Sequence, residues 1–347
     1  MSLEVAVVGV GRWGRNHVRV LSALRKEYID RLIVVDSDFS RAKEVANAYS
    51  ADAFYDSVEE LFSWEKNLDA VVVVVPTVYH YRVVDSLLDH YDVFVEKPLA
   101  ETIEQGFSLA LKSLSSGRVL AVGHIERFNP IVGIARKLLE QSKKKIYAFE
   151  ARRLGPGPAG NYTLNLGVAH DLLVHDVDIA AAFLEDLPRT VYASAVPGDG
   201  FPYEVEIEAL YSYPGARTAH IVASWRTAPS YKHRSFSVRT EDSIITIDYI
   251  LRRIVIDNGV QRVETPTVST ALHSENTHLE ISYLQEEPLK LELKDFLEAV
   301  SHKRRPQVSA VEGYIALKCV VKALESAARR SPVEITWDEL SRLNYTF

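Results

Sequence analysis

The sequence predicts a two-domain protein of the α/β plus α+β class, in which a doubly wound parallel sheet precedes an open antiparallel sheet. Three observations support this prediction. Apolar strands alternate with helices through the first third of the chain, which is the rhythm of βαβ units. Longer strands with period-two alternation follow from Lys145. The length of 347 residues also exceeds the size at which one hydrophobic core stops growing.

The first domain is expected to alternate strands and helices without interruption. Its parallel strands are predicted at residues 5–8, 32–36, 53–55, 69–75, 93–95 and 119–122. The helices between them are predicted at residues 15–24, 41–49, 58–62 (capped by Ser57), 79–89 and 103–115. Because the last strand of this kind ends near Gly123, we expect the first domain to cover residues 1–125.

The second domain, residues 126–347, is expected to be rich in antiparallel strands, with two C-terminal helices that can return to the first domain. Strands are predicted at 146–152, 190–195, 204–213, 218–225, 234–239, 243–248 and 253–257, and helices at 172–184, 289–300 and 311–329. Turns are predicted at 213–215 and 257–259, and a loop at 155–160. An open sheet of about seven strands would leave a broad apolar face in water. We therefore expect a homodimer or homotetramer that pairs through this face.

Composition excludes several classes of protein. A formal net charge of −7 argues against nucleic acid as a partner. No apolar stretch reaches the roughly 18–20 residues that span a bilayer, so no membrane segment is expected. The N-terminus enters a strand almost at once, which indicates a cytoplasmic protein without a signal peptide. The single cysteine, Cys319, excludes a disulfide framework and lies at a predicted buried helix position.

The most informative motif is a glycine-rich turn directly after the first strand. Gly9, Gly11 and Gly14 form G-x-G-x-x-G between an apolar strand and a predicted helix. The first glycine permits the tight turn, the second lets the backbone approach a pyrophosphate, and the third allows close helix–strand packing. The helix start then offers free N–H groups and a positive dipole end to phosphates. This context predicts a dinucleotide-binding Rossmann domain.

Asp36 predicts which dinucleotide is bound. It ends the second strand and lies 22 residues after Gly14, the spacing expected for a ribose-binding carboxylate. A carboxylate there accepts hydrogen bonds from the ribose hydroxyls and repels a 2′-phosphate. Arg41 is the nearest basic residue downstream and leaves NADP open, whereas Asp38 adds a second negative charge. The sequence therefore favours NAD.

Four segments occur in order along the chain and together resemble one family. They are the glycine turn at 9–14, Val75-Pro76-Thr77 with His80, Glu96-Lys97-Pro98-Leu99-Ala100, and the D-x-x-x-H-D-x-D run from Asp171 to Asp178. The combination resembles the Gfo/Idh/MocA-type oxidoreductases over nearly the whole chain. The resemblance implies an NAD-binding set of Gly9, Gly11, Arg12, Trp13, Gly14, Asp36, Pro76, Thr77, His80, Glu96 and Lys97.

The position of Lys97 in the predicted sheet makes it a candidate catalytic residue, independently of the family resemblance. It follows a parallel strand at the carboxyl end, where the ligands of doubly wound sheets collect. A half-buried lysine can donate a hydrogen bond to a substrate oxygen and stabilise an alkoxide. The alternative is a solvated surface lysine loosely paired with Glu96. The resemblance implies that Lys97 is catalytic and that the Lys97–Pro98 peptide bond is cis.

Asp171 and His175 are the second catalytic candidates. Their i, i+4 spacing on a predicted helix places both on one face. His175 has an ordinary pKa suited to accepting a proton near neutrality, and Asp171 could orient the hydroxyl or the imidazole. The alternatives are a satisfied core histidine, or a metal site built from His170, Asp171, His175 and Asp176. The resembled family generally needs no metal for hydride transfer, so no metal is expected.

A further layer of resemblance concerns the substrate. The segment 122–130, Ser224-Trp225-Arg226, Asp248-Tyr249 and 287–293 resemble the UDP-N-acetylglucosamine 3-dehydrogenase branch of the family. A diphosphate needs cations, which Arg127, Arg153, Lys232 and Arg234 could provide. The substrate-binding residues expected from this comparison are Arg127, Asn129, Arg153, Lys232 and Arg234.

The expected function is NAD-dependent oxidation of a secondary sugar hydroxyl, at C3 of UDP-N-acetylglucosamine or a related UDP-sugar. His175 would take the hydroxyl proton, Lys97 would stabilise the alkoxide, and Asp171 would position the hydroxyl. A free sugar or inositol dehydrogenase is the alternative within the enzyme class. A non-catalytic dinucleotide-sensing regulator is the alternative outside it, although such a sensor would need no base.

Overall fold

A computed structural model describes residues 2–157, 166–257, 278–282 and 286–345, with backbone only for 278–282. The chain divides into two compact units. The first contains Met1–Ile125, Glu287–Leu317 and Ser341–Tyr345. The second contains Glu126–Glu286, Lys318–Leu340 and Thr346–Phe347.

The first unit is a doubly wound parallel sheet, as the sequence predicts. Six parallel strands lie in the order β3-β2-β1-β4-β5-β6, with the change of direction at β1 and β4. The strands are β1 Leu3–Val8, β2 Ile29–Val35, β3 Ala53–Tyr55, β4 Ala70–Val73, β5 Asp92–Glu96 and β6 Leu120–Gly123. The helices between them are α1 Gly14–Leu24, α2 Phe39–Tyr49, α3 Val58–Trp64, α4 His80–Leu88 and α5 Ile103–Ser116.

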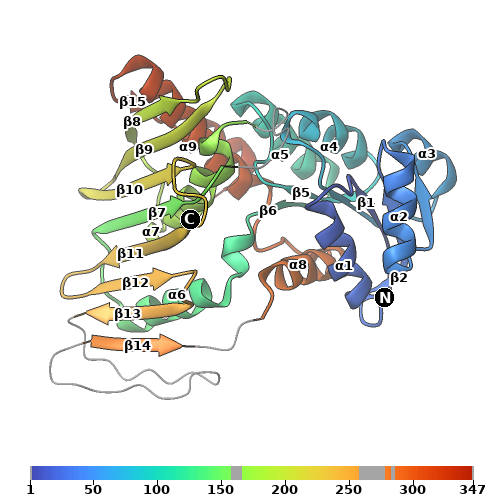
Figure 1. Ribbon diagram of the computed structural model, residues 1–347, viewed down its shortest axis with the longest axis horizontal. Helices are drawn as coiled ribbons and strands as arrows, with labels where there is room; N and C mark the ends of the chain where they lie inside the picture. Colours follow the sequence, from blue (N-terminus) through green and yellow to red (C-terminus); the bar gives the residue numbers. More distant parts are fainter. Residues whose placement is uncertain (1, 158–165, 258–277, 283–285, 346–347) are drawn as a thin grey trace. The chain divides into compact units, whose positions relative to one another are not determined.

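A helix from late in the chain completes the core of the first unit. Helix α8, Pro288–His302, packs beside α1 (Figure 1). Its apolar side chains join those of α1, α2 and the central strands in one buried cluster, to which Leu293, Phe296 and Leu297 contribute. Residues 5–8 of β1 and all of β4 are buried on both faces. Their sequences are continuous, valine-rich apolar runs, as expected for strands of a covered parallel sheet.

The second unit contains a nine-stranded sheet in the order β14-β13-β12-β11-β7-β10-β9-β8-β15 (Figure 1). Its strands are β7 Ala148–Leu154, β8 Thr190–Pro197, β9 Glu204–Tyr213, β10 Arg217–Ser224, β11 His233–Arg239, β12 Ile244–Asp248, β13 Arg253–Asp257, β14 His278–Ser282 and β15 Val333–Glu334. Its helices are α6 Pro130–Ser142, α7 Val174–Leu184 and the part of α9 (Ala310–Arg329) from Lys318 onward. Cys319 is a free, buried thiol in α9, as expected.

The prediction of a purely antiparallel sheet is wrong at one pair of strands. β7 and β10 run parallel at the centre of the sheet, while the other neighbouring strands are antiparallel. The chain leaves β7 through α7 and passes along β8 and β9 before it returns, and such a long crossover permits parallel pairing. The short edge strands β14 and β15 were not expected. Residues 258–259 of one predicted turn and 158–160 of the predicted loop lie outside the described residues.

The sheet has one apolar and one polar face. The apolar face carries Phe149, Phe236 and Ile247, and Phe149 and Phe236 pack against Phe183 of α7. The opposite face carries alternating polar side chains, and a shallow hollow there is lined mainly by Glu150, Arg152, His220, Ser235, Ser237 and Thr246. The expected broad apolar face is therefore largely replaced by charged and hydroxyl groups. Leu210, opposite His220, and Tyr192, opposite Leu210, are apolar side chains exposed beside them.

The described part of the chain contains no helix that is both long and apolar enough to cross a lipid bilayer.

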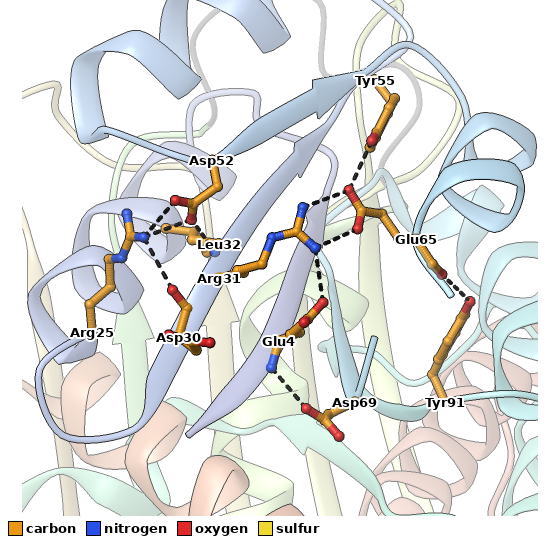
Figure 2. Close-up of polar contacts among 10 residues, drawn as sticks. All are labelled: Glu4, Arg25, Asp30, Arg31, Leu32, Asp52, Tyr55, Glu65, Asp69 and Tyr91. Atoms are coloured by element: carbon orange, nitrogen blue, oxygen red, sulfur yellow. Dashed lines mark hydrogen bonds and ion pairs between the residues drawn. The ribbon is translucent and has the colours of Figure 1, made fainter. Parts of the chain in front are cut away.

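A network of charged side chains links neighbouring strands at the edge of the first unit where its parallel strands begin (Figure 2). Arg31 of β2 donates two hydrogen bonds to the Glu65 carboxylate, at 2.8 and 3.1 Å, and one to Glu4 of β1, at 3.0 Å. Tyr55 donates to Glu65 at 2.8 Å, and Asp69 accepts from the Glu4 backbone N–H at 2.8 Å. Burial raises the pKa of Glu65, but Arg31 and Tyr55 outweigh it and hold that pKa below its ordinary value.

Replacing Arg31 by methionine is expected to destabilise the protein because the buried Glu65 carboxylate loses its cation. The cost is about 1–3 kcal/mol at neutral pH, less than for a fully buried pair because Arg31 is partly exposed. Glu65 stabilises the fold above its unfolded pKa of about 4.5, and this contribution is lost as pH falls through the lower folded pKa. The difference between wild type and Arg31→Met should therefore shrink on acidification, measured by urea unfolding.

Arg15→Met is the matched control, since Arg15 pairs with Glu44 on an exposed surface of the same unit. It should cost less than about 0.5 kcal/mol. Equal losses in the two variants, or a loss in Arg31→Met that is independent of pH, would contradict the role given to Glu65.

Candidate active site

The loop between β1 and α1 has the geometry predicted for its glycines. Gly9 has a φ of +88°, in the left-handed region that favours glycine. A Cβ atom on Gly14 would lie 1.9 Å from the carbonyl oxygen of Gly9, so α1 can approach the loop only at a glycine. A Cβ on Gly11 would meet no heavy atom within 4 Å. Open space therefore remains where a phosphate group would approach the backbone.

The N-terminus of α1 is available to an anion. Among the described residues, no side chain caps this terminus, and its first turn holds no acidic residue. Free N–H groups and the positive dipole end of a helix attract phosphate. Arg12 and Trp13 are exposed beside it. Together with the open space at Gly11, these features fit the pyrophosphate of a dinucleotide.

The carboxylate of Asp36 is fixed at the end of β2. It accepts hydrogen bonds from the backbone N–H groups of Val10 at 2.8 Å and Asp38 at 3.0 Å. Arg41 Nη1 lies 3.3 Å from Asp36 Oδ1, and Arg41 Nη2 lies 3.0 Å from Asp38 Oδ2. A 2′-phosphate placed here would face two carboxylates and a guanidinium that they already hold. The arrangement therefore favours NAD over NADP.

Lys97 directly follows β5 and is half-buried. The Lys97–Pro98 peptide bond is cis, as the family resemblance implied. Since β1, β2 and β5 are parallel members of one sheet, Lys97 leaves the same edge as the glycine loop and Asp36. Ligands of doubly wound sheets collect at this edge.

Glu96 is buried beneath the glycine loop. Its Oε1 accepts a hydrogen bond from Trp13 Nε1 at 2.7 Å, and His17 Nε2 lies 3.1 Å from the same oxygen. Its Oε2 accepts from the backbone N–H of Lys97 at 3.2 Å. Burial raises the pKa of Glu96, but His17, Trp13 and Lys97 outweigh it and lower that pKa. Glu96 stays a predicted cofactor-binding residue, and in the structure its carboxylate joins the glycine loop to the Lys97 backbone.

His17 was missed by the sequence reasoning. A histidine four residues after Trp13, on the apolar face of α1, was the available signal.

His80 also contacts the Lys97–Pro98 segment from within the first unit. Its Nδ1 lies 2.8 Å from the Pro98 carbonyl oxygen, and its Nε2 lies 2.9 Å from that of Val75. A neutral imidazole donates to only one of these oxygens, so both bonds require the doubly protonated ring. Burial lowers the pKa of His80, and the two carbonyls oppose that shift. Both ring nitrogens of His80, which stays a predicted cofactor-binding residue, thus lie within hydrogen-bond distance of backbone carbonyl oxygens. Pro76 and Thr77 precede His80 at the start of the 3₁₀ turn Thr77–Tyr79.

The helix with Asp171 and His175 begins differently from the prediction. Ala169–Leu173 form a π-helical turn, in which the Val174 N–H bonds to the Ala169 carbonyl five residues back. The regular helix α7 starts only at Val174. The i, i+4 argument assumed an α-helix through both residues, and the wider turn alters the angle between them. Asp171 is half-buried and His175 is buried.

Glu204 of β9 holds the start of this turn, and sequence reasoning did not single it out. Its carboxylate accepts a hydrogen bond from the Ala169 backbone N–H at 2.9 Å. A Cβ atom on Gly167 would lie 2.2 Å from Glu204 Oε1, so the carboxylate packs directly on this glycine. Burial raises the pKa of Glu204.

Two of the expected substrate cations are bound to carboxylates of α7. Arg153 donates from Nε and Nη2 to Asp176, at 2.9 and 2.8 Å. Arg127 donates from Nε and Nη2 to Asp178, at 2.7 and 2.9 Å. Both guanidinium groups are therefore bound to carboxylates, and their contact with a diphosphate stays a prediction.

Asn129, also expected at the substrate, lies in the same internal network. Its amide donates to Glu126 at 3.1 Å, and its side-chain oxygen accepts from the backbone N–H of Ile131 at the N-terminus of α6.

Lys232 and Arg234 present cations without a carboxylate partner. Within the described residues, neither forms an ion pair with an acidic side chain. The charge of Arg234, followed by burial, lowers the pKa of Lys232. Burial and then the charge of Arg153 lower the pKa of Arg234, whereas Glu126, Asp171 and Asp176 act in the opposite direction. An anion would stabilise two like charges held close together in this way.

The structure thus groups the candidate residues within each unit. The first unit holds Gly9, Gly11, Arg12, Trp13, Gly14, Asp36, Pro76, Thr77, His80, Glu96 and Lys97. The second holds Asp171, His175, Lys232 and Arg234, with Arg127, Asn129 and Arg153 in its interior network. No cluster of three or more His, Cys, Asp or Glu side chains able to hold a metal occurs among the residues that the structure describes.

Two family models match the chain. Residues 3–124 match the model described as "Oxidoreductase family, NAD-binding Rossmann fold", and residues 135–246 match the "GFO/IDH/MocA C-terminal domain".

Individual proteins are similar at lower levels. The scyllo-inositol 2-dehydrogenase (NAD(+)) of Bacillus subtilis is 26% identical over 96% of each chain. The UDP-N-acetylglucosamine 3-dehydrogenase of Acidithiobacillus ferrooxidans is 31% identical over 56% of this chain and 58% of its own. A solved structure of the latter enzyme covers 95% of this chain and 98% of its own with a TM-score of 0.80 and 24% identity, which shows the shared fold.

The first family model agrees with the Rossmann features of the first unit, namely the glycine loop, the Asp36 carboxylate and the sheet edge that Lys97 follows. The second agrees with the large mixed sheet. The chain belongs to the Gfo/Idh/MocA family of oxidoreductases and carries its NAD-binding Rossmann domain.

Proposed function

We propose that this protein is an NAD-dependent dehydrogenase that oxidises a secondary hydroxyl of a nucleotide sugar to a ketone, with C3 of UDP-N-acetylglucosamine or a related UDP-sugar as the substrate. The observation that carries the substrate class is the pair Lys232 and Arg234. Neither forms an ion pair with a carboxylate in the described residues, and Arg234 interacts electrostatically with Asp171. A diphosphate supplies the anion that such a pair lacks.

The proposed chemistry needs three side chains. Bound NAD supplies the acceptor for the hydride, which leaves the carbinol carbon with both electrons of its C–H bond. Neutral His175 takes the hydroxyl proton, so that a C=O bond forms as the C–H bond breaks. The Lys97 ammonium donates a hydrogen bond to the same oxygen while negative charge develops on it. Asp171 orients the hydroxyl group.

A polyol or free-sugar dehydrogenase is the second candidate. The full-length similarity to scyllo-inositol 2-dehydrogenase favours it, whereas the similarity to the UDP-N-acetylglucosamine enzyme covers little more than half of each chain. A dinucleotide-sensing regulator without turnover is the candidate from another class. Lys97 at the ligand edge of the sheet argues against it, because a sensor needs no group to stabilise an alkoxide.

Removing the proposed base should abolish catalysis without removing the cofactor. His175→Ala is expected to lower kcat by about 10²–10⁴-fold, because proton transfer loses its acceptor. Lys97→Ala should lower kcat through loss of alkoxide stabilisation. The NADH dissociation constant of both variants should stay within about twofold of wild type, measured by fluorescence titration.

Exposed residues of the same types serve as controls for these variants, namely His302→Ala and Lys137→Ala. Both should turn over at the wild-type rate. Near-normal turnover by His175→Ala or Lys97→Ala would remove that residue from the mechanism.

The substrate class is tested by NADH formation on UDP-N-acetylglucosamine, its uronic acid, glucose and myo-inositol, with a ketone trap. We expect activity on the UDP-sugars. Lys232→Ala should raise the KM for the UDP-sugar about 10- to 100-fold through loss of a charge-assisted bond. It should also reduce the salt dependence of KM and leave the KM for NAD unchanged.

Arg239→Ala is the matched control, because Arg239 lies at the far end of the strand that contains Arg234 and is exposed. It should change neither KM. Activity confined to glucose or myo-inositol would assign the protein to the polyol candidate and leave the hydride-transfer chemistry in place.

We also propose that the polar face of the large sheet pairs with a second copy to give a homodimer or homotetramer. Glu150, Arg152, Glu208 and His220 place both charge signs on this face, so a two-fold axis can oppose unlike charges. Light scattering at micromolar concentration should give at least twice the chain mass of 39.0 kDa. Arg152→Glu should shift it toward the monomer, and a monomeric wild type would refute the pairing.

A further inference from the structure

Two arginines form bidentate hydrogen bonds, or forks, with carboxylates of the helix that carries His175. Asp176 and Asp178 follow His175 in α7, and each receives a bidentate guanidinium. Arg153 comes from β7, whereas Arg127 lies in the 3₁₀ turn Ile125–Phe128. Two elements distant in sequence therefore hold the carboxylates of the first and third residues after the proposed base.

The Arg153 fork is buried on both sides. The side chains of Arg153 and Asp176 are 2% and 1% exposed. The third nitrogen of Arg153, Nη1, donates to Glu126 Oε1 at 2.8 Å, so every nitrogen of the guanidinium has a carboxylate acceptor. The guanidinium also lies over the Tyr249 ring, 5.3 Å from its centroid. A cation enclosed in this way is not available to a substrate.

The ionisation of Asp176 and of Glu126 depends on the charge of Arg153. Burial raises the pKa of Asp176, and Arg153 acts against that shift. Burial also raises the pKa of Glu126, but Arg153 outweighs it and lowers that pKa. A lysine at position 153 would supply one compact charge in place of a planar fork, and could not donate from three fixed nitrogens to two carboxylates.

The same network accounts for the segment 122–130, which the proposed reaction leaves without a role. Glu126 accepts from Arg153 and from the Asn129 amide. Arg127 binds Asp178, and Asn129 caps α6. Glu126, Arg127 and Asn129 of this segment thus have these partners inside the second unit.

We propose that Arg153 and Arg127 are positioning residues that fix the rotation and placement of α7, and thereby orient His175, rather than cations that bind the substrate. The proposal rests on the proposed role of His175 in proton transfer. A helix anchored at the first and third residues after the base cannot turn about its axis without breaking a buried fork. Displacements of about 1 Å at a reacting group cost on the order of 10²-fold in rate.

The test compares Arg153→Lys with Arg152→Lys in steady-state turnover of the full-length protein with NAD and the UDP-sugar. Arg152 is the neighbouring arginine on β7, exposed on the opposite face of the sheet. Arg153→Lys should lower kcat about 10- to 100-fold, while the KM values for the UDP-sugar and NAD change less than twofold. Arg152→Lys should match wild type. A raised KM for the UDP-sugar with an unchanged kcat would make Arg153 a substrate ligand and overturn the proposal.

Hydrogen exchange tests the anchor without turnover. In Arg153→Lys, backbone amides of residues 169–184 should exchange at least about tenfold faster than in wild type or Arg152→Lys, and peptides from β1 to β6 should be unchanged. Unchanged protection of 169–184 would overturn the proposal. If wild type turns over no substrate, or if His175→Ala remains active, the proposed function fails while this result still decides whether α7 is anchored.

Arg127→Lys covers the case in which Arg153→Lys does not fold. Its side chain is 12% exposed, so the change leaves a shorter cation near Asp178 with access to water. We expect the same pattern in smaller measure: a lower kcat, unchanged KM values and faster exchange in α7. A kcat and exchange rates equal to wild type would contradict the role given to Arg127.

Discussion

Carboxylates placed in the protein interior are the constraint on which both units depend. An ionised carboxylate loses several kcal/mol of hydration on burial unless cations or N–H donors replace the water. In the first unit, Asp36 and Glu96 are each met by donors from the glycine loop or from α1. In the second unit, Glu126 and Asp176 share the guanidinium of Arg153. Each carboxylate therefore ties elements that are remote in the sequence.

This constraint links the two motifs of the first unit. The glycine loop and the Glu96-Lys97-Pro98 segment are separate in the sequence, but Trp13 and His17 reach the Glu96 carboxylate from the loop and its helix. His80 holds the Pro98 carbonyl from the other side of the segment. The loop that suits a dinucleotide and the lysine that suits a hydroxyl oxygen thus belong to one rigid polar cluster.

The same constraint separates cations that build the second unit from cations that can serve a ligand. Arg127 and Arg153 are committed to aspartates of α7, so their charge holds a helix in place. The charge of Arg234 lowers the pKa of Lys232, and burial with the charge of Arg153 lowers the pKa of Arg234. Neither cation forms an ion pair with an acidic side chain among the described residues. The choice between a nucleotide sugar and a neutral polyol depends on the latter pair.

Local patterns in the sequence determined a large part of this structure. The valine-rich strands, the helices between them, the Ser57 cap and the glycine turn followed from periodicity and backbone sterics, which act over a few residues. The position of Asp36 after its strand and of Lys97 after β5 followed as well, because parallel strands end at one edge.

Only the tertiary structure decided which partners these residues take. The parallel pairing of β7 with β10, the π turn at Ala169–Leu173 and the polar outer face of the sheet depend on how distant segments pack. The sequence identified Arg127 and Arg153 as cations but not their roles. An arginine binds whichever acceptor the fold brings within about 3 Å. Asp176 lies 23 residues from Arg153, and Asp178 lies 51 residues from Arg127, so neither pairing has a signature in local periodicity.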